Sequence, residues 1–170
     1  MLRHLVLLVL ISSKFALADQ DFLQARCEML FPEAMVSLQE AIASHGYTVS
    51  RVQHVDKGLR QRGYETGLYR VVFFGQPQQM DMVRETHLEL VPYLPLKISL
   101  YEEGERVTAS ALQPAKLAPF FDDDNIHQLL ANWQKDLVKI MASYGQCSET
   151  VSALDEIHQP FLSYMPVSRQ

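Results

Sequence analysis

Residues 96–111 read LKISLYEEGERVTASA, and their pattern gives the clearest indication of the architecture. Its apolar residues alternate with polar ones in two runs separated by Glu103-Gly104. The first run holds Leu96, Ile98 and Leu100, and the second holds Val107, Ala109 and Ala111. A period of two is typical of strands with one buried face, so the stretch predicts a β-hairpin that buries one side.

Further helices and strands are predicted on the N-terminal side of this hairpin. Residues 22–30 fit a strand or a helical lead-in, and apolar spacing predicts a helix over 31–45 that ends at Gly46. A β-rich segment with a bulge or an early end follows at 47–55, then a loop or short helix at 56–66. Residues 68–74 are apolar on both faces, as in a central strand, and 78–86 predict a helix. Pro92 and Pro95 predict an extended approach to the hairpin.

One long helix is predicted on the C-terminal side. Three acids, Asp122 to Asp124, precede it, and acids favour the N-terminal end of a helix dipole. Its apolar face is formed by Ile126, Leu129, Leu130, Trp133, Leu137, Ile140 and Tyr144. Strands and helices are therefore interspersed, which predicts an α+β fold: a two-layer sandwich with helices on one face of a mainly antiparallel sheet.

The first eighteen residues have the parts of a secretory signal peptide. Arg3 is followed by the apolar run Leu5–Ile11, and an Ala-x-Ala sequence ends at Ala18. We therefore expect cleavage after Ala18, a single domain over 19–145, a C-terminal tail over 146–170, and a periplasmic or secreted protein. The apolar run is far shorter than the roughly 20 residues that span a bilayer, and we expect no membrane span.

The net charge and the two cysteines limit the classes of function that the protein can have. The chain has a formal net charge of −5, and removing Arg3 and Lys14 with the signal leaves 13 basic and 20 acidic residues. An acidic chain argues against nucleic-acid binding. Cys27 and Cys147 lie near the two ends of the domain and would reach an oxidising compartment, so they are candidates for a disulfide; two unpaired thiols are the alternative.

Three stretches carry a family resemblance: GYTVSRVQHVDKGL (46–59), GYETGLYRVVFFG (63–75) and LVPYLPLKISLYEEGERV (90–107). Together with the helix that contains Trp133, they resemble the domain-of-unknown-function 302 family over roughly residues 30–142. The resemblance implies a β-α-β(4)-α sandwich similar to the TATA-binding-protein-like fold. It implies no activity and no catalytic residue, since the family has no agreed activity.

Polar residues gather on two neighbouring segments, and they form the best candidate cluster. They are Arg51, His54, Asp56, Tyr64 and Arg70. His54 and Asp56 are two residues apart, so they share a side if the strand persists, and a carboxylate beside an imidazole can orient it for acid–base work. An ordinary surface ion pair is the alternative interpretation.

Met80, Met82 and His87 raise a copper hypothesis, because thioethers and imidazole suit Cu(I). On a helix, however, Met80 and Met82 point to different faces, and only Met80 and His87 share one. The alternative is that Met80 packs on the sheet. We therefore assign no metal site and no cofactor on this evidence.

The familiar catalytic motifs are absent from the sequence, including the nucleophile elbow, the P-loop, the His-Glu-x-x-His pair and Cys-x-x-Cys. The leading hypothesis is an exported, non-enzymatic module that binds a small apolar molecule or a partner protein. A ligand would lie between sheet and helix, lined by Tyr69, Phe73, Phe74 and Trp133. An enzyme using His54 and Asp56, and a copper carrier, are the alternatives. A homodimer is left open.

Overall fold

The computed structural model describes residues 21–144. The strands are β1 (Phe22–Cys27), β2 (Thr48–His54), β3 (Tyr69–Gly75), β4 (Leu96–Glu103) and β5 (Arg106–Leu112). The helices are α1 (Phe31–Ser44), α2 (Val55–Arg60), α3 (Pro77–Thr86) and α4 (Asp124–Ser143), with 3₁₀ segments η1 (Leu88–Tyr93) and η2 (Pro114–Phe120). The predicted elements occur in the predicted order, the undecided opening segment is a strand, and the short helix before β3 is α2.

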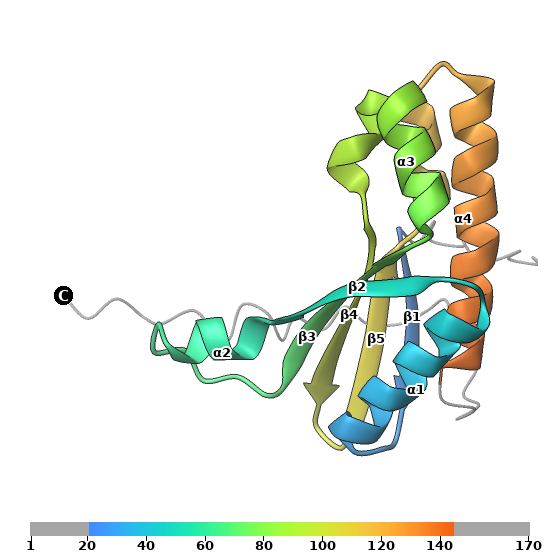
Figure 1. Cartoon of the computed structure of the whole chain (residues 1–170). Helices are drawn as coiled ribbons and strands as arrows, with labels where there is room; N and C mark the ends of the chain where they lie inside the picture. Colours follow the sequence, from blue (N-terminus) through green and yellow to red (C-terminus); the bar gives the residue numbers. More distant parts are fainter. Residues whose placement is uncertain (1–20, 145–170) are drawn as a thin grey trace, which may run out of the picture.

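The five strands form one antiparallel sheet in the order β1-β5-β4-β3-β2 (Figure 1). The predicted hairpin is β4–β5, with Leu100 opposite Ala109, and Gly104 turns the chain with a positive φ of 64°. The predicted irregularity in β2 is a register shift between Val49 and Arg51. The α+β class is therefore confirmed, and the sheet is antiparallel throughout the described residues.

The approach to β4 differs from the extended segment that the prolines predicted. Residues 88–93 form η1, with Pro92 inside it, and only Leu94 and Pro95 precede the strand. The fixed φ of proline is compatible with a 3₁₀ turn, so Pro92 does not force extension. Val91, which precedes Pro92, is part of η1 despite the preference for extension before proline, whereas Leu94 follows that preference with a ψ of 155°.

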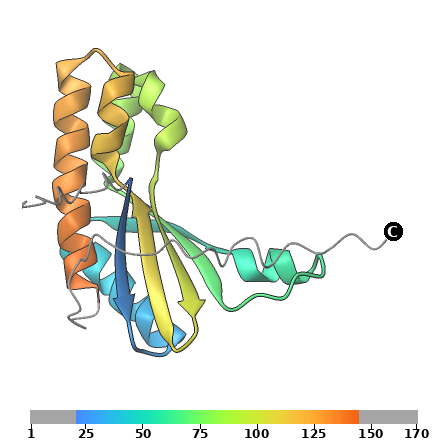
Figure 2. The same ribbon diagram turned by 180° about the vertical axis from the view of Figure 1, so that it is seen from behind.

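Within residues 21–144, helices cover only one face of the sheet. The residues of β3 and β4 with no exposure, Val72, Phe74, Ile98 and Leu100, join α1 and the C-terminal half of α4 in the larger of two buried clusters. Viewed from behind, the sheet presents its other face with no helix over it (Figure 2). The architecture is a two-layer sandwich, and one side of the sheet faces away from both helices.

A second, smaller buried cluster lies beyond the sheet, where α3 runs beside the N-terminal half of α4 (Figure 1). Its buried members are Val83, Leu90, Ile126, Leu130 and Trp133. Trp133 is fully enclosed there, and its indole Nε1 donates a 2.7 Å hydrogen bond to Oε1 of Gln79. Because α4 contributes to both clusters, it joins the two parts of the molecule.

Candidate functional site

The candidate polar cluster contains one buried carboxylate, Asp56, whose side chain is 1% exposed. Its Oδ1 accepts a hydrogen bond from Nη1 of Arg70, and its Oδ2 lies 3.5 Å from Nη1 of Arg60. Arg70 also donates to the carbonyl of Tyr69 at 3.0 Å, and its guanidinium carbon lies 5.5 Å from the centroid of the Phe31 ring. Both oxygens of the carboxylate therefore face guanidinium groups.

The end of β2 explains why Asp56 points inward. The strand ends at His54, which pairs with Arg70 on β3, and α2 begins at the next residue. The helical turn breaks the two-residue alternation, so Asp56 faces Arg70 instead of continuing along the strand with His54. Arg60 lies four residues later on the same helix and reaches the same carboxylate.

The other members of the cluster do not converge on Asp56. Among the described residues, the exposed side chain of His54 makes no hydrogen bond or ion pair with it. Arg51 pairs with Phe73 on the opposite face of the sheet, and Tyr64 lies in the loop after α2. The geometry groups Asp56 with Arg70 and Arg60, an arrangement that holds α2 against β3.

The copper candidates lie in different surroundings. Met80 packs against the second cluster, close to the backbone of Gly75, while Met82 is exposed and its sulfur lies 3.6 Å from the hydroxyl of Thr86. His87 ends α3, with Nδ1 3.9 Å from Glu89 and 4.0 Å from Asp123. Residues 21–144 contain no cluster of three or more His, Cys, Asp or Glu side chains suited to a metal ion.

The four aromatic residues expected to line a ligand do not share a cavity. Phe74 is buried in the larger cluster, edge-on to Tyr47 at 5.6 Å between centroids, whereas Trp133 belongs to the second cluster. Tyr69 and Phe73 alternate with the buried residues of β3, so they lie on the other face of the sheet. A ligand held between sheet and helix by all four is therefore not what the geometry offers.

The uncovered face of the sheet is the more extensive feature. It consists of the side chains that pair across the strands opposite to the buried set. These are Phe22, Gln24 and Arg26 on β1, Arg51 and Gln53 on β2, Tyr69, Val71 and Phe73 on β3, Lys97, Ser99, Tyr101 and Glu103 on β4, and Arg106, Thr108, Ser110 and Leu112 on β5. We call this set the uncovered face. Thr108 is fully buried by its neighbours, and Arg106 lies 3.5 Å from Glu28.

An aromatic and aliphatic stripe runs along β3 and β4 on the uncovered face. Tyr69 and Tyr101 are paired in register, and their rings meet edge to face at 6.2 Å. Val71 and Phe73 continue the stripe along β3, and all four side chains are partly exposed. Such a stripe on a flat sheet offers apolar contact area with polar groups at its margin, which suits a macromolecular partner better than an enclosed small molecule.

The charges of the uncovered face are mostly basic, although the whole chain is acidic. Glu103 accepts a 2.9 Å hydrogen bond from the hydroxyl of Thr108 and lies 3.6 Å from Nε of Arg26. The positive charge of Arg26 therefore offsets the negative charge of Glu103. Burial raises the pKa of Tyr101, and the neighbouring Glu103 carboxylate raises it further, which keeps the phenol protonated. Arg51 and Lys97 form no ion pair within residues 21–144, so they are available to an acidic group.

This face was missed from the sequence, although a signal was present. Residues 68–74 are apolar on both sides, which was interpreted as a strand covered on both faces. In a sheet that carries helices on one side only, the second apolar side must face outward. The pattern therefore pointed to an apolar surface as well as to a core.

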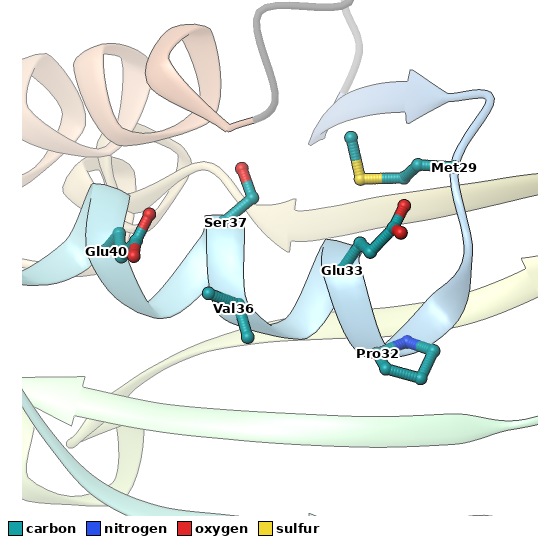
Figure 3. A pocket seen from close by; sticks show the side chains of 6 residues that line it. All are labelled: Met29, Pro32, Glu33, Val36, Ser37 and Glu40. Atoms are coloured by element: carbon teal, nitrogen blue, oxygen red, sulfur yellow. The ribbon is translucent and has the colours of Figure 1, made fainter.

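A second surface feature is a hollow along the outer side of α1 (Figure 3). Its wall consists of Met29, Pro32, Glu33, Val36, Ser37 and Glu40. The hollow is shallow and open to solvent, and its two carboxylates come from the helix itself. It contains none of the residues singled out from the sequence.

Cys27 lies at the end of β1 and is 2% exposed. Its Sγ lies 3.8 Å from the carbonyl oxygen of Tyr144, the residue that follows α4. Cys147 is outside the described residues, and so are the expected signal peptide and C-terminal tail. The pairing of the two cysteines therefore stays a prediction. Within the described range, no helix has the length and hydropathy to cross a membrane.

The geometry defines a class: a small α+β domain with a one-sided antiparallel sheet and an exposed, basic and aromatic face. The family model described as "Domain of unknown function DUF302" matches residues 23–144, and the chain belongs to this family. A crystal structure of an uncharacterized conserved DUF302 protein from Bacillus stearothermophilus is similar, with a TM-score of 0.67 and 18% identity over 73% of this chain and 98% of that one. No curated protein matches the chain.

Proposed function

We propose that the protein is an exported, non-enzymatic binding module that recognises a partner protein through the uncovered face of its sheet. One observation carries the proposal: both packing helices lie on one side of the sheet, while the other side holds the stripe of Tyr69, Val71, Phe73 and Tyr101. Large apolar side chains gathered on one exposed face are typical of interaction surfaces.

The burial and ion pairing of Asp56 support a binding role for the protein over a catalytic one. A general base needs a carboxylate or imidazole within hydrogen-bond reach of a substrate proton. Here both oxygens of Asp56 face Arg70 and Arg60, and its side chain is almost fully enclosed. The charge of this carboxylate is therefore used to fix α2 on β3.

The chemistry of the face also favours a particular kind of partner surface. Arg51 and Lys97 flank Phe73 by register, on β2 and β4. A partner that places acidic groups opposite these two cations and apolar side chains on the stripe between them would match both charge and hydropathy.

Export and a disulfide belong to the same proposal. The sequence features of residues 1–18 support secretion, and in that compartment Cys27 and Cys147 can pair. The proximity of Cys27 to the end of α4 supports the pairing, because Cys147 is only three residues beyond Tyr144. Peptide mapping without reduction would detect the Cys27–Cys147 peptide, or two unlinked peptides if this part of the proposal is wrong.

Site-specific photo-crosslinking in the native cells tests the binding role. A photoreactive residue at Ser99, in the middle of the uncovered face, should give an adduct with one defined protein. The same residue at Lys135, exposed on α4, serves as the control and should give none. The Arg51→Glu/Lys97→Glu variant should lose most of the Ser99 adduct. Equal adducts from both positions, or no adduct from Ser99, would contradict the proposal.

A further inference from the structure

The two 3₁₀ segments expose large apolar side chains at the end of the molecule farthest from the sheet. Leu88, Val91 and Tyr93 on η1 are 69%, 39% and 39% exposed, and Phe120 on η2 is 74% exposed. We call these four residues the tip patch. Large apolar side chains with this much exposure cost free energy in water unless they are covered part of the time.

The tip patch lies directly on the second buried cluster. Leu90 of η1 is fully buried in the second cluster, and Phe121, next to Phe120, packs against that cluster. The rings of Tyr93 and Phe121 meet edge to face at 6.2 Å, which places η1 beside η2. The patch is therefore a preformed surface, and binding to it requires little ordering.

The chain around the tip patch carries more acids than bases. Residues 84–96 and 116–134 contain five acids, Glu85, Glu89, Asp122, Asp123 and Asp124, and two bases, Arg84 and Lys116. Arg84 pairs with Asp81, and Nζ of Lys116 lies 4.0 Å from Asp21. Asp123 accepts a 2.7 Å hydrogen bond from the backbone N–H of Asn125, and this bond lowers its pKa. With five acids and two bases that already have acidic partners, this region has a net negative charge, which attracts basic groups.

We infer that the tip patch binds a basic amphipathic segment of a second protein, with its apolar side chains on Leu88 and Phe120 and its Lys or Arg side chains facing the surrounding acids. Three observations support it: the exposed apolar side chains, the buried cluster beneath them, and the excess of acids around them. An anionic membrane would be repelled by the same acids. The inference is independent of the uncovered face, which is basic and lies on the sheet.

A synthetic Leu/Lys amphipathic peptide is a direct probe, with a Leu/Glu peptide of the same pattern as its counterpart. Binding of each to the full chain is measured by fluorescence anisotropy, and the contacted residues are mapped by amide chemical shifts. We expect the Leu/Lys peptide to bind and to shift the amides of η1 and η2, while the Leu/Glu peptide binds at least about tenfold more weakly.

Amino-acid substitutions distinguish binding at the tip patch from general electrostatic attraction of a basic peptide to an acidic protein. Phe120→Ser and Leu88→Ser should each weaken Leu/Lys binding by about tenfold, as expected for central apolar contacts, without loss of the folded state. Val138→Ser, at a residue 40% exposed on α4, is the matched control and should bind as the wild type does. Shifts that map away from η1 and η2, equal binding of both peptides, or unchanged binding by Phe120→Ser would overturn the inference. So would self-association of the chain that depends on Phe120, because the patch would then serve a second copy.

Discussion

The contacts of Asp56 show which side-chain partners can be predicted from sequence spacing and which cannot. The sequence predicts a polar cluster with Asp56 beside His54, whereas the carboxylate of Asp56 lies against Arg70 and Arg60. The spacing rule for strands assumes that the strand continues, and β2 ends at His54. Which residue a carboxylate meets after a strand ends depends on the turn that follows, and the sequence does not specify that turn.

The buried pair of Asp56 and Arg70 gives the first prediction. Asp56→Asn leaves the guanidinium of Arg70, 12% exposed, without its counter-charge, and should lower the free energy of unfolding by about 3 kcal/mol. Asp81→Asn breaks the exposed pair between Asp81 and Arg84 and is the matched control, with a loss below about 1 kcal/mol. Urea denaturation measures both. Equal losses in the two variants would show that Asp56 is not a structural anchor.

Tyr144 gives a prediction on pH. Burial raises the pKa of its phenol to about 12, above the ordinary value of 10.0, so folding favours the protonated form. The resulting stability is present below about pH 10 and is lost as the pH rises through about 12. Tyr144→Phe should therefore make the alkaline decline in stability shallower, as followed by denaturation at a series of pH values. A decline as steep as in the wild type would contradict the assignment.

The positions of the helices and strands were predicted better than the neighbours against which they pack. The helical periodicity of residues 124–144 correctly gave one apolar face, yet the structure divides that face between two buried clusters. Periodicity shows which side of a helix is buried but not which neighbour buries it. The same limit applies to β3, whose two apolar sides were both assigned to the core. The 3₁₀ segments were missed because they are too short to set a period.

The shared helix predicts cooperative unfolding. Leu130→Ala, at a fully buried residue of the second cluster, should lower the free energy of unfolding by about 2–5 kcal/mol, while Val138→Ala on the exposed side of α4 should change it little. Trp133 fluorescence reports on the second cluster, and far-UV circular dichroism reports on the whole chain. The two transitions should coincide. An earlier fluorescence transition in the wild type would show that the second cluster unfolds on its own.

At the scale of the whole molecule, the sequence identified the fold class and the family, because alternating strands and long amphipathic helices are local patterns. The uncovered face and the tip patch come from the assembled topology: strand order decides which side chains share a surface, and long-range packing decides which of them stay exposed. The two surfaces differ in charge. The sheet presents Arg51 and Lys97, and the tip carries more acids than bases, so the molecule is suited to two chemically different contacts.

Native mass spectrometry of the protein purified from its own cells tests whether the uncovered face recognises a partner protein. We predict a complex with a second polypeptide for the wild type and loss of that polypeptide in Arg51→Glu/Lys97→Glu, whose substitutions lie at exposed positions; a partner held by the tip patch would stay bound in both. A wild-type chain that carries only a small organic molecule, only copper, or nothing at all would contradict recognition of a partner protein through the uncovered face.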